Sequence, residues 1–186
     1  MIMEENMRIH AAISMATRAH NGQKRKASDL DYIAHPMEVM GILIAMGCNI
    51  DLIIAGALHD TVEDTYIELE DIQKEFGENV ARLVKSHTED KSKSWKERKT
   101  ITINYLADAQ LDEKILALAD LVANERSMIE DMENLGDEMF NRFKAPKAEI
   151  DWYYKGCIDA MEDLEGIDKV KQFFDEAIDN YNIIFR

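Results

Sequence analysis

The segment from Ile50 to Leu58 places the strongest constraint on how this chain can fold. Its residues are apolar on nearly every side of a helix, so other parts of the chain must surround it. A helix at the protein surface would instead show one apolar stripe and one polar face. The sequence therefore predicts that this helix is the central and most buried element of the fold.

Side chains that can bind a metal ion or transfer a proton follow this helix directly. They are His59, Asp60, Glu63 and Asp64. Residues four apart share a helix face, so His59 would lie beside Glu63, and Asp60 beside Asp64. Carboxylates held close together raise each other's pKa, which is unfavourable unless a cation lies among them. The pattern thus indicates a metal site, and the alternative is an acidic, solvated helix end in a chain of net charge −15.

The remaining sequence predicts an all-α fold, a single-domain helical bundle. Prolines are two and glycines eight, and no stretch alternates apolar and polar residues as a strand would. We expect helices over residues 5–20, 35–46, 50–60, 65–76, 79–87, 101–109, 112–133, 138–164 and 168–184. Ser94 is a candidate cap before Trp95, and Pro146 should kink or restart its helix. We assign residues 1–165 to one domain and residues 166–186 to a C-terminal helix packed on it.

Composition and charge exclude several classes of partner. A net charge of −15 argues against non-specific nucleic-acid binding and against an anionic membrane surface. No apolar run approaches the roughly 20 residues that span a bilayer. Two distant cysteines, Cys48 and Cys157, favour a reducing cytoplasm over a disulfide scaffold. We expect a cytoplasmic protein that acts on a small molecule, and a homo-oligomer is compatible with the sequence.

Residues with the chemistry of metal ligands also occur outside the central segment. His35 precedes Pro36 at the start of a predicted helix, and Asp120 falls within the apolar surface of another. A carboxylate at such a position is costly unless it has a partner. The candidate ligands are therefore His35, His59, Asp60 and Asp120. Imidazole nitrogen and carboxylate oxygen suit Mn²⁺, Zn²⁺ or Fe²⁺.

An ordered series of motifs gives the chain a resemblance to a known family. The series reads Ala19-His20-Asn21-Gly22-Gln23-x-Arg25-Lys26, Tyr32-Ile33-x-His35-Pro36, His59-Asp60-Thr61-Val62-Glu63-Asp64-Thr65, Phe76-Gly77, Thr88-Glu89-Asp90, Trp95-x-x-Arg98-Lys99 and Leu118-Ala119-Asp120-x-x-x-Asn124-x-Arg126. In this order the motifs resemble the HD-domain hydrolases of the RelA/SpoT type, over roughly residues 10 to 160. We expect no synthetase domain beside it, so the chain resembles the stand-alone small alarmone hydrolases.

This resemblance implies a metal-dependent phosphohydrolase. The family hydrolyses the 3′-pyrophosphate of ppGpp or pppGpp, which gives GDP or GTP and pyrophosphate. It binds one Mn²⁺ through the residues that match His35, His59, Asp60 and Asp120. A bound metal ion acidifies water and polarises the phosphoryl oxygen under attack.

The resemblance also implies roles for residues around the metal. The positions that match Glu63 and Asp64 are the catalytic carboxylates. Those that match Arg25 and Lys26 hold the nucleotide base, and the one that matches Asn124 contacts the ribose. His20 matches a position that is not a ligand, which favours a structural or supporting role for it.

Departures from the family pattern leave the choice of nucleotide open. Leu121 stands where the family usually has Lys, and the loop after Lys26 is one residue longer and acidic at Asp29 and Asp31. These changes concern the substrate side of the site rather than the metal. An adenine alarmone, NADPH or a nucleoside monophosphate is an alternative substrate, and a non-catalytic nucleotide sensor is an alternative function.

Overall fold

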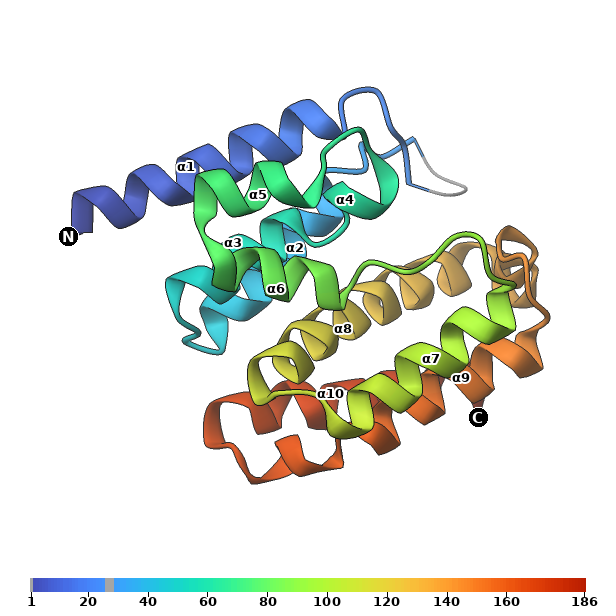
Figure 1. Ribbon diagram of the computed structural model, residues 1–186. Helices are drawn as coiled ribbons and strands as arrows, with labels where there is room; N and C mark the ends of the chain where they lie inside the picture. The colour runs from blue at the N-terminus through green and yellow to red at the C-terminus, as the bar shows by residue number, and fades with distance from the viewer. Residues whose placement is uncertain (1, 26–28) are drawn as a thin grey trace. The chain divides into compact units, whose positions relative to one another are not determined.

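The computed structural model describes residues 2–25 and 29–186, and these residues form helices (Figure 1). The helices are α1 (Ile2–Ala19), α2 (Ala34–Ala45), α3 (Ile50–Leu58), α4 (Thr61–Asp64), α5 (Leu69–Phe76), α6 (Glu78–Ser86), α7 (Trp95–Asp108), α8 (Leu111–Leu135), η1 (Gly136–Arg142), α9 (Lys147–Ala160), η2 (Glu162–Gly166) and α10 (Asp168–Phe185). Within the described ranges, extended pairing is limited to an isolated antiparallel bridge between Lys24 and Asp31. The predicted all-α class is confirmed.

The chain divides into two compact units, Met1–Thr88 and Glu89–Arg186. In the first unit, α3 packs against α1, α2 and α6, and α5 packs against α6. Residues Leu52, Ile54, Ala55, Gly56, Ala57 and Leu58 of α3 are all buried. The predicted central position of this helix is therefore confirmed within its unit. The assignment of residues 1–165 to one domain and 166–186 to an added helix stays a prediction.

Helices α2 and α3 form an antiparallel pair joined by a short turn. Gly47 adopts a positive φ of 72°, and the N–H of Cys48 donates to the carbonyl of Leu43 across the end of α2. The side chain of Asn49 then accepts from the N–H of Leu52 at 3.0 Å and caps α3. This connection places the start of α2 beside the end of α3, where the two candidate histidines lie.

Gly56 allows α2 and α3 to approach closely. A Cβ atom at this position would lie 2.5 Å from Cδ1 of Leu43 and 3.5 Å from the backbone of Met40. Leu43 is fully buried, so its methyl group would have to move within a filled interior. A larger residue here would therefore force Leu43 to repack.

Asp51 ties α1 and α6 to the start of α3. One carboxylate oxygen accepts from Arg8 at 2.7 Å, and the other accepts from the amide of Asn79 at 3.0 Å. Burial alone would raise the pKa of Asp51, but the hydrogen bonds from Asn79 and Arg8 outweigh it and hold the pKa below its ordinary value. Arg8 also donates to the carbonyl of Phe76 at the end of α5.

The second unit pairs α8 with α10 and α7 with α9. The predicted cap is confirmed, because the hydroxyl of Ser94 accepts from the N–H of Glu97 at the start of α7. The restart predicted at Pro146 is confirmed, whereas the helix predicted over residues 138–164 differs in type before the proline, where η1 is a 3-10 helix, and in its end, because α9 stops at Ala160. α8 ends at Gly136 with a φ of 57°, η1 follows, and Pro146 caps a new helix, α9. Proline lacks the N–H that a helix interior needs, so it restarts the helix.

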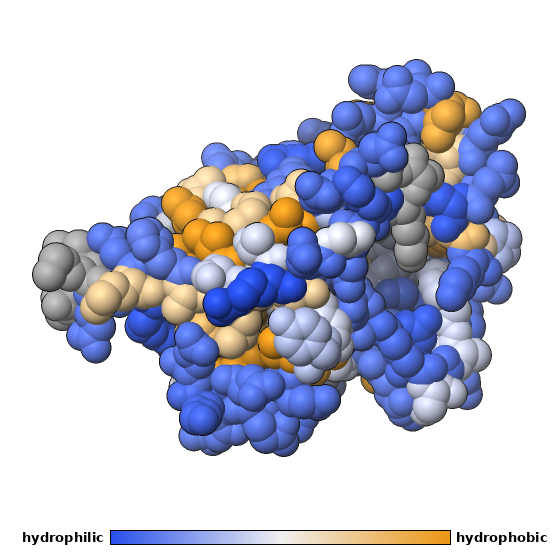
Figure 2. Space-filling view, turned by 90° about the horizontal axis from the view of Figure 1, so that it is seen from above, coloured by the Kyte–Doolittle hydropathy of each residue, from blue (hydrophilic) through white to orange (hydrophobic). Residues whose placement is uncertain are grey.

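The surface of the first unit mixes apolar and charged side chains. Met7 and Tyr66 are 65% and 70% exposed. Figure 2 shows hydrophobic residues gathered among hydrophilic ones on the face seen from above. An open groove of about 490 Å³ is lined by Met15, Ile67, Asp71, Lys74 and Glu75. None of the described helices is long and apolar enough to cross a membrane.

Glu125 is fully buried where α8 packs against α10. Burial, and after it the negative charge of Glu176, raise its pKa to about 9, and Asn180 offsets them only in part. The ordinary value is 4.5, so the folded chain keeps a proton that the unfolded chain releases. This group therefore lowers the free energy of unfolding progressively as the pH rises through the window between these two values.

Replacing Glu125 with glutamine should stabilise the second unit above the lower end of this window. We expect the variant to gain up to about 1.4 kcal/mol over the native chain for each pH unit within it. Urea unfolding followed by circular dichroism at several pH values measures this gain. Glu130→Gln, an exposed change on the same helix, should keep the native pH dependence. A Glu125→Gln variant less stable than the native chain near neutral pH would contradict the prediction.

Candidate metal centre

His35 is placed by the start of α2. The helix begins at Ala34, and Pro36 occupies the first turn, where a missing N–H is tolerated. The N–H of His35 donates to the carbonyl of Tyr32 at 3.0 Å, which fixes the turn before the helix. The imidazole is 3% exposed, so it points into the interior of the first unit.

His59 is placed by the end of α3. Its Nδ1 atom lies 2.8 Å from the carbonyl oxygen of Gly56. Because a carbonyl oxygen only accepts, Nδ1 must carry the proton, and Nε2 of the neutral ring keeps its lone pair. The histidine is 1% exposed, so this lone pair is held within the protein and is suited to a metal ion.

The carboxylate of Asp60 lies close to both histidines. Its Oδ2 atom lies 3.1 Å from Nε2 of His59 and 3.6 Å from Nε2 of His35. The two imidazole rings are 5.2 Å apart between centroids. A carboxylate oxygen facing a nitrogen lone pair is unfavourable unless a proton or a cation lies between them. Two imidazole nitrogens and one carboxylate oxygen thus form a donor set that fits a divalent metal ion.

The two predicted catalytic carboxylates follow in α4. α3 ends at Leu58 and α4 is a separate single turn, so the continuous helical face predicted through Asp64 is wrong in detail. The N–H of Asp64 donates to the carbonyl of Asp60 at 2.9 Å, which closes the turn. Glu63 is half-buried and Asp64 is exposed. Both carboxylates therefore stand one turn after a candidate ligand.

Contacts around Asp60 and α4 come from residues for which no role was predicted. The hydroxyl of Tyr32 donates to Oδ2 of Asp60 at 2.6 Å, and Nε2 of Gln23 donates to the carbonyl of Asp64 at 2.9 Å. His20, expected in a supporting role, lies 2.8 Å from Oε1 of Gln23 and 4.8 Å from the ring of Tyr32. The sequence signal that could have pointed to Tyr32 and Gln23 is that both belong to the motif series.

Arg25, one of the two predicted base contacts, lies in the segment that precedes α2. The guanidinium carbon of Arg25 is 6.0 Å from the ring centre of Tyr32, at the outer limit of a cation–π contact. Lys26 lies outside the described residues, as do residues 27 and 28 of the lengthened loop. The acidic Asp31 accepts from Lys24 at 2.8 Å, so this departure from the family pattern is neutralised locally.

Asp120 and Asn124 lie four residues apart on α8 in the second unit. The amide of Asn124 donates to Oδ1 of Asp120 at 2.7 Å. The predicted need of this carboxylate for a partner is therefore met at least in part by Asn124. Leu121, the departure from the usual Lys, is 6% exposed and belongs to the apolar interior of its unit.

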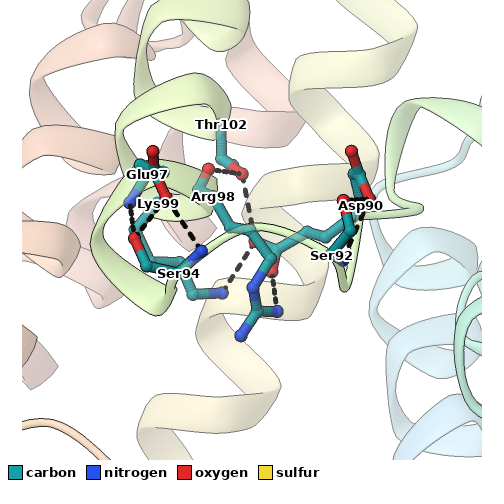
Figure 3. A network of polar contacts seen from close by, with 8 residues as sticks. Asp90, Ser92, Ser94, Glu97, Arg98, Lys99 and Thr102 are labelled. Carbon is teal, nitrogen blue, oxygen red and sulfur yellow. Dashed lines mark hydrogen bonds and ion pairs between the residues drawn. The ribbon is translucent and has the colours of Figure 1, made fainter.

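Basic residues gather near the start of the second unit, and several of them are paired with acids (Figure 3). Glu89 accepts from Arg98 at 2.5 Å and from Lys99 at 2.9 Å. Asp90 accepts from Lys93 at 2.5 Å. These pairs make the start of the second unit less positive than its sequence indicates.

The family of the chain follows from comparison with known proteins. The HD-domain family profile matches residues 12–110, which is more than half of the 186 residues. The matched stretch contains His35, His59 and Asp60. This chain belongs to the HD-domain family.

Curated relatives support the resemblance to alarmone enzymes. A GTP pyrophosphokinase of Streptomyces coelicolor is 40% identical over 124 residues, which cover 64% of this chain and 14% of the relative. The guanosine-3′,5′-bis(diphosphate) 3′-pyrophosphohydrolase MESH1 of Homo sapiens is 36% identical over 120 residues, which cover 63% of this chain and 67% of the relative. The chain thus spans a small part of the pyrophosphokinase and about two thirds of the hydrolase.

Solved structures agree with these relatives. A crystal structure of the protein lmo0812 from Listeria monocytogenes has a TM-score of 0.75 at 38% identity and covers 81% of this chain and 98% of its own. A metazoan orthologue of SpoT, described as hydrolysing ppGpp, has a TM-score of 0.76 at 27% identity and covers 92% of this chain and 94% of its own. The resemblance predicted from the motifs is confirmed.

Replacing His59 with glutamine should remove bound metal. Glutamine lacks the imidazole lone pair that Gly56 directs toward Asp60, so the donor set loses one nitrogen. After dialysis against Mn²⁺, elemental analysis should find about one ion per native chain and far less in the variant. His10→Gln, an exposed change on α1, should keep the native metal content. Full occupancy in His59→Gln would show that this nitrogen is not a ligand.

Proposed function

We propose that this chain is a divalent-metal-dependent hydrolase of guanosine alarmones. It would convert ppGpp or pppGpp and water into GDP or GTP and pyrophosphate. The observation that carries the proposal is the cluster of the buried His35 and His59 with the half-buried Asp60, followed within one turn by Glu63 and Asp64, in a member of the HD-domain family. Relatives that the chain matches over much of their length are named as hydrolases of this substrate.

The proposed metal ligands are His35, His59, Asp60 and Asp120. The first three lie together in the first unit, and the family resemblance supports Asp120 as the fourth. We propose Mn²⁺ as the natural ion, with Zn²⁺ and Fe²⁺ as substitutes, because all three accept nitrogen and oxygen ligands. A divalent ion at these residues acts as a Lewis acid toward water and the phosphoryl oxygen.

Glu63 and Asp64 are the proposed acid–base residues. An ionised carboxylate on α4 can accept a proton from attacking water, and the same proton can be returned to the leaving oxygen. Asp64 is exposed and its backbone is held by Asp60 and by Gln23, so its side chain stands at the open side of the turn. Glu63, half-buried, is the more shielded of the two.

Arg25, Lys26 and Asn124 are the proposed substrate contacts. A planar guanidinium can stack on a purine, which an ammonium group does less well. Asn124 carries both a donor and an acceptor, as recognition of a ribose hydroxyl requires. The nucleotide is the one partner we propose. The expected absence of nucleic-acid and membrane partners, the homo-oligomer and the cytoplasmic location stay predictions.

A second candidate is hydrolysis of another nucleotide by the same site. Leu121 favours it, because a buried leucine cannot give the positive charge that the usual Lys provides. An adenine alarmone, NADPH or a nucleoside monophosphate would be the substrate, and a panel of these compounds with ppGpp separates the two candidates. A non-catalytic nucleotide sensor is disfavoured because both Glu63 and Asp64 are present.

Replacing Asp64 with asparagine should abolish turnover. The amide cannot accept the proton, so release of pyrophosphate from ppGpp in the presence of Mn²⁺ should fall by at least about 100-fold. Anion-exchange chromatography of the nucleotides measures this rate. Asp179→Asn, an exposed change on α10, should keep the native rate. The proposed function is wrong if the native chain releases no pyrophosphate from any 3′-pyrophosphorylated nucleotide.

Replacing Arg25 with lysine should weaken nucleotide binding although the charge is kept. Loss of the planar group should raise KM for ppGpp by about 10-fold, since one stacking contact amounts to about 1 to 3 kcal/mol. The kcat should change much less, because Arg25 is not among the metal or proton-transfer residues. Arg18→Lys, an exposed change on α1, is the matched control. An unchanged KM in Arg25→Lys would rule out stacking.

A further inference from the structure

Tyr32 makes the shortest of the hydrogen bonds described at the metal cluster. Its hydroxyl donates to Oδ2 of Asp60 at 2.6 Å, and the same oxygen lies 3.1 Å from Nε2 of His59. A separation of 2.6 Å is within the range of about 2.5 to 2.7 Å typical of a hydroxyl that donates to an ionised carboxylate. The bond therefore restricts rotation of the Asp60 carboxylate.

Tyr32 is itself held by the turn that begins α2. Its N–H donates to the carbonyl of Gln23 at 2.9 Å, and its carbonyl accepts from the N–H of His35 at 3.0 Å. Its ring lies 4.8 Å from the ring of the buried His20. The residue is thus tied to one candidate ligand through the backbone and to another through its side chain.

The ring and the hydroxyl of Tyr32 face different groups. The hydroxyl meets Asp60, whereas the guanidinium of Arg25 lies 6.0 Å from the ring centre. Phenylalanine would keep the ring and remove the hydroxyl, and leucine would remove both. The two contacts can therefore be separated by substitution.

We infer that Tyr32 is a positioning residue for the metal centre. Its hydroxyl holds Oδ2 of Asp60 toward the histidine nitrogens, and its ring supports Arg25 on the substrate side. The inference rests on the proposed function, because it takes Asp60 as a ligand. Residues that orient a ligand in this way typically contribute 10- to 100-fold to metal affinity.

The decisive variant is Tyr32→Phe, tested first without any nucleotide. Metal-free protein is titrated with Mn²⁺, and the free ion is followed by electron paramagnetic resonance. We expect the Kd for Mn²⁺ to rise by about 10- to 100-fold. Tyr66→Phe removes a hydroxyl from a side chain that is 70% exposed and should leave the Kd unchanged. The metal-free variant should melt within a few degrees of the native chain, since one hydrogen bond is lost.

Turnover of ppGpp then distinguishes positioning from a general structural role. In Tyr32→Phe, the Mn²⁺ concentration that gives half of the maximal rate should rise with the Kd. The maximal rate should recover at saturating Mn²⁺, and KM for ppGpp should stay native. Tyr32→Leu should show the same loss of metal affinity together with a raised KM, because Arg25 loses its support.

Different results would overturn different claims. If the native chain binds Mn²⁺ and Tyr32→Phe binds it equally well, the role of Tyr32 is wrong and the proposed function stands. A lowered maximal rate that excess Mn²⁺ does not restore would also overturn the positioning role. If the native chain binds none of Mn²⁺, Zn²⁺ or Fe²⁺, the metal-dependent function and this inference fall together.

Discussion

The close approach of α2 and α3 at Gly56 is the constraint on which the site depends. The missing side chain lets the two helices approach closely, since a Cβ there would meet Leu43 at 2.5 Å. The carbonyl of the same glycine accepts a hydrogen bond from Nδ1–H of His59. One residue therefore contributes to both the spacing of the helices and the tautomer of the imidazole. Because the helices are antiparallel, His35 at the start of one reaches His59 at the end of the other.

The short segment after α3 carries candidate metal ligands and, directly after them, candidate acid–base residues. His59 and Asp60 supply donor atoms, and α4 presents Glu63 and Asp64 one turn later. The turn is closed by a backbone hydrogen bond from Asp64 to Asp60. The spacing between candidate ligands and candidate acids is thus fixed by local geometry, whereas His35 must be delivered by the packing of another helix.

The sequence predicted the elements better than the contacts between them. Periodicity and the positions of glycine and proline located most helices, because those signals are local. The restart at Pro146 was predicted correctly, but the stretch before it forms the 3-10 helix η1 rather than an α-helix, a difference that composition does not indicate. The hydrogen bond from Tyr32 to Asp60 joins residues 28 positions apart, so no periodic pattern in the sequence could indicate it. Likewise, the sequence indicated that the acidic Asp31 changes the substrate side of the site. The structure shows that Lys24 donates a hydrogen bond to its carboxylate.

The turn between α1 and α2 has an outer loop whose length can change and an inner part that holds Tyr32 in place. Two backbone hydrogen bonds close this turn: the N–H of Arg25 donates to the carbonyl of Leu30, and the N–H of Tyr32 donates to the carbonyl of Gln23. Residues added or lost between Arg25 and Leu30 therefore need not disturb Tyr32. Its hydrogen bonds to His35 and Asp60 lie beyond the two backbone hydrogen bonds that close the turn. A change in loop length would then alter the surface beside Arg25 while the contacts that Tyr32 makes stay as they are.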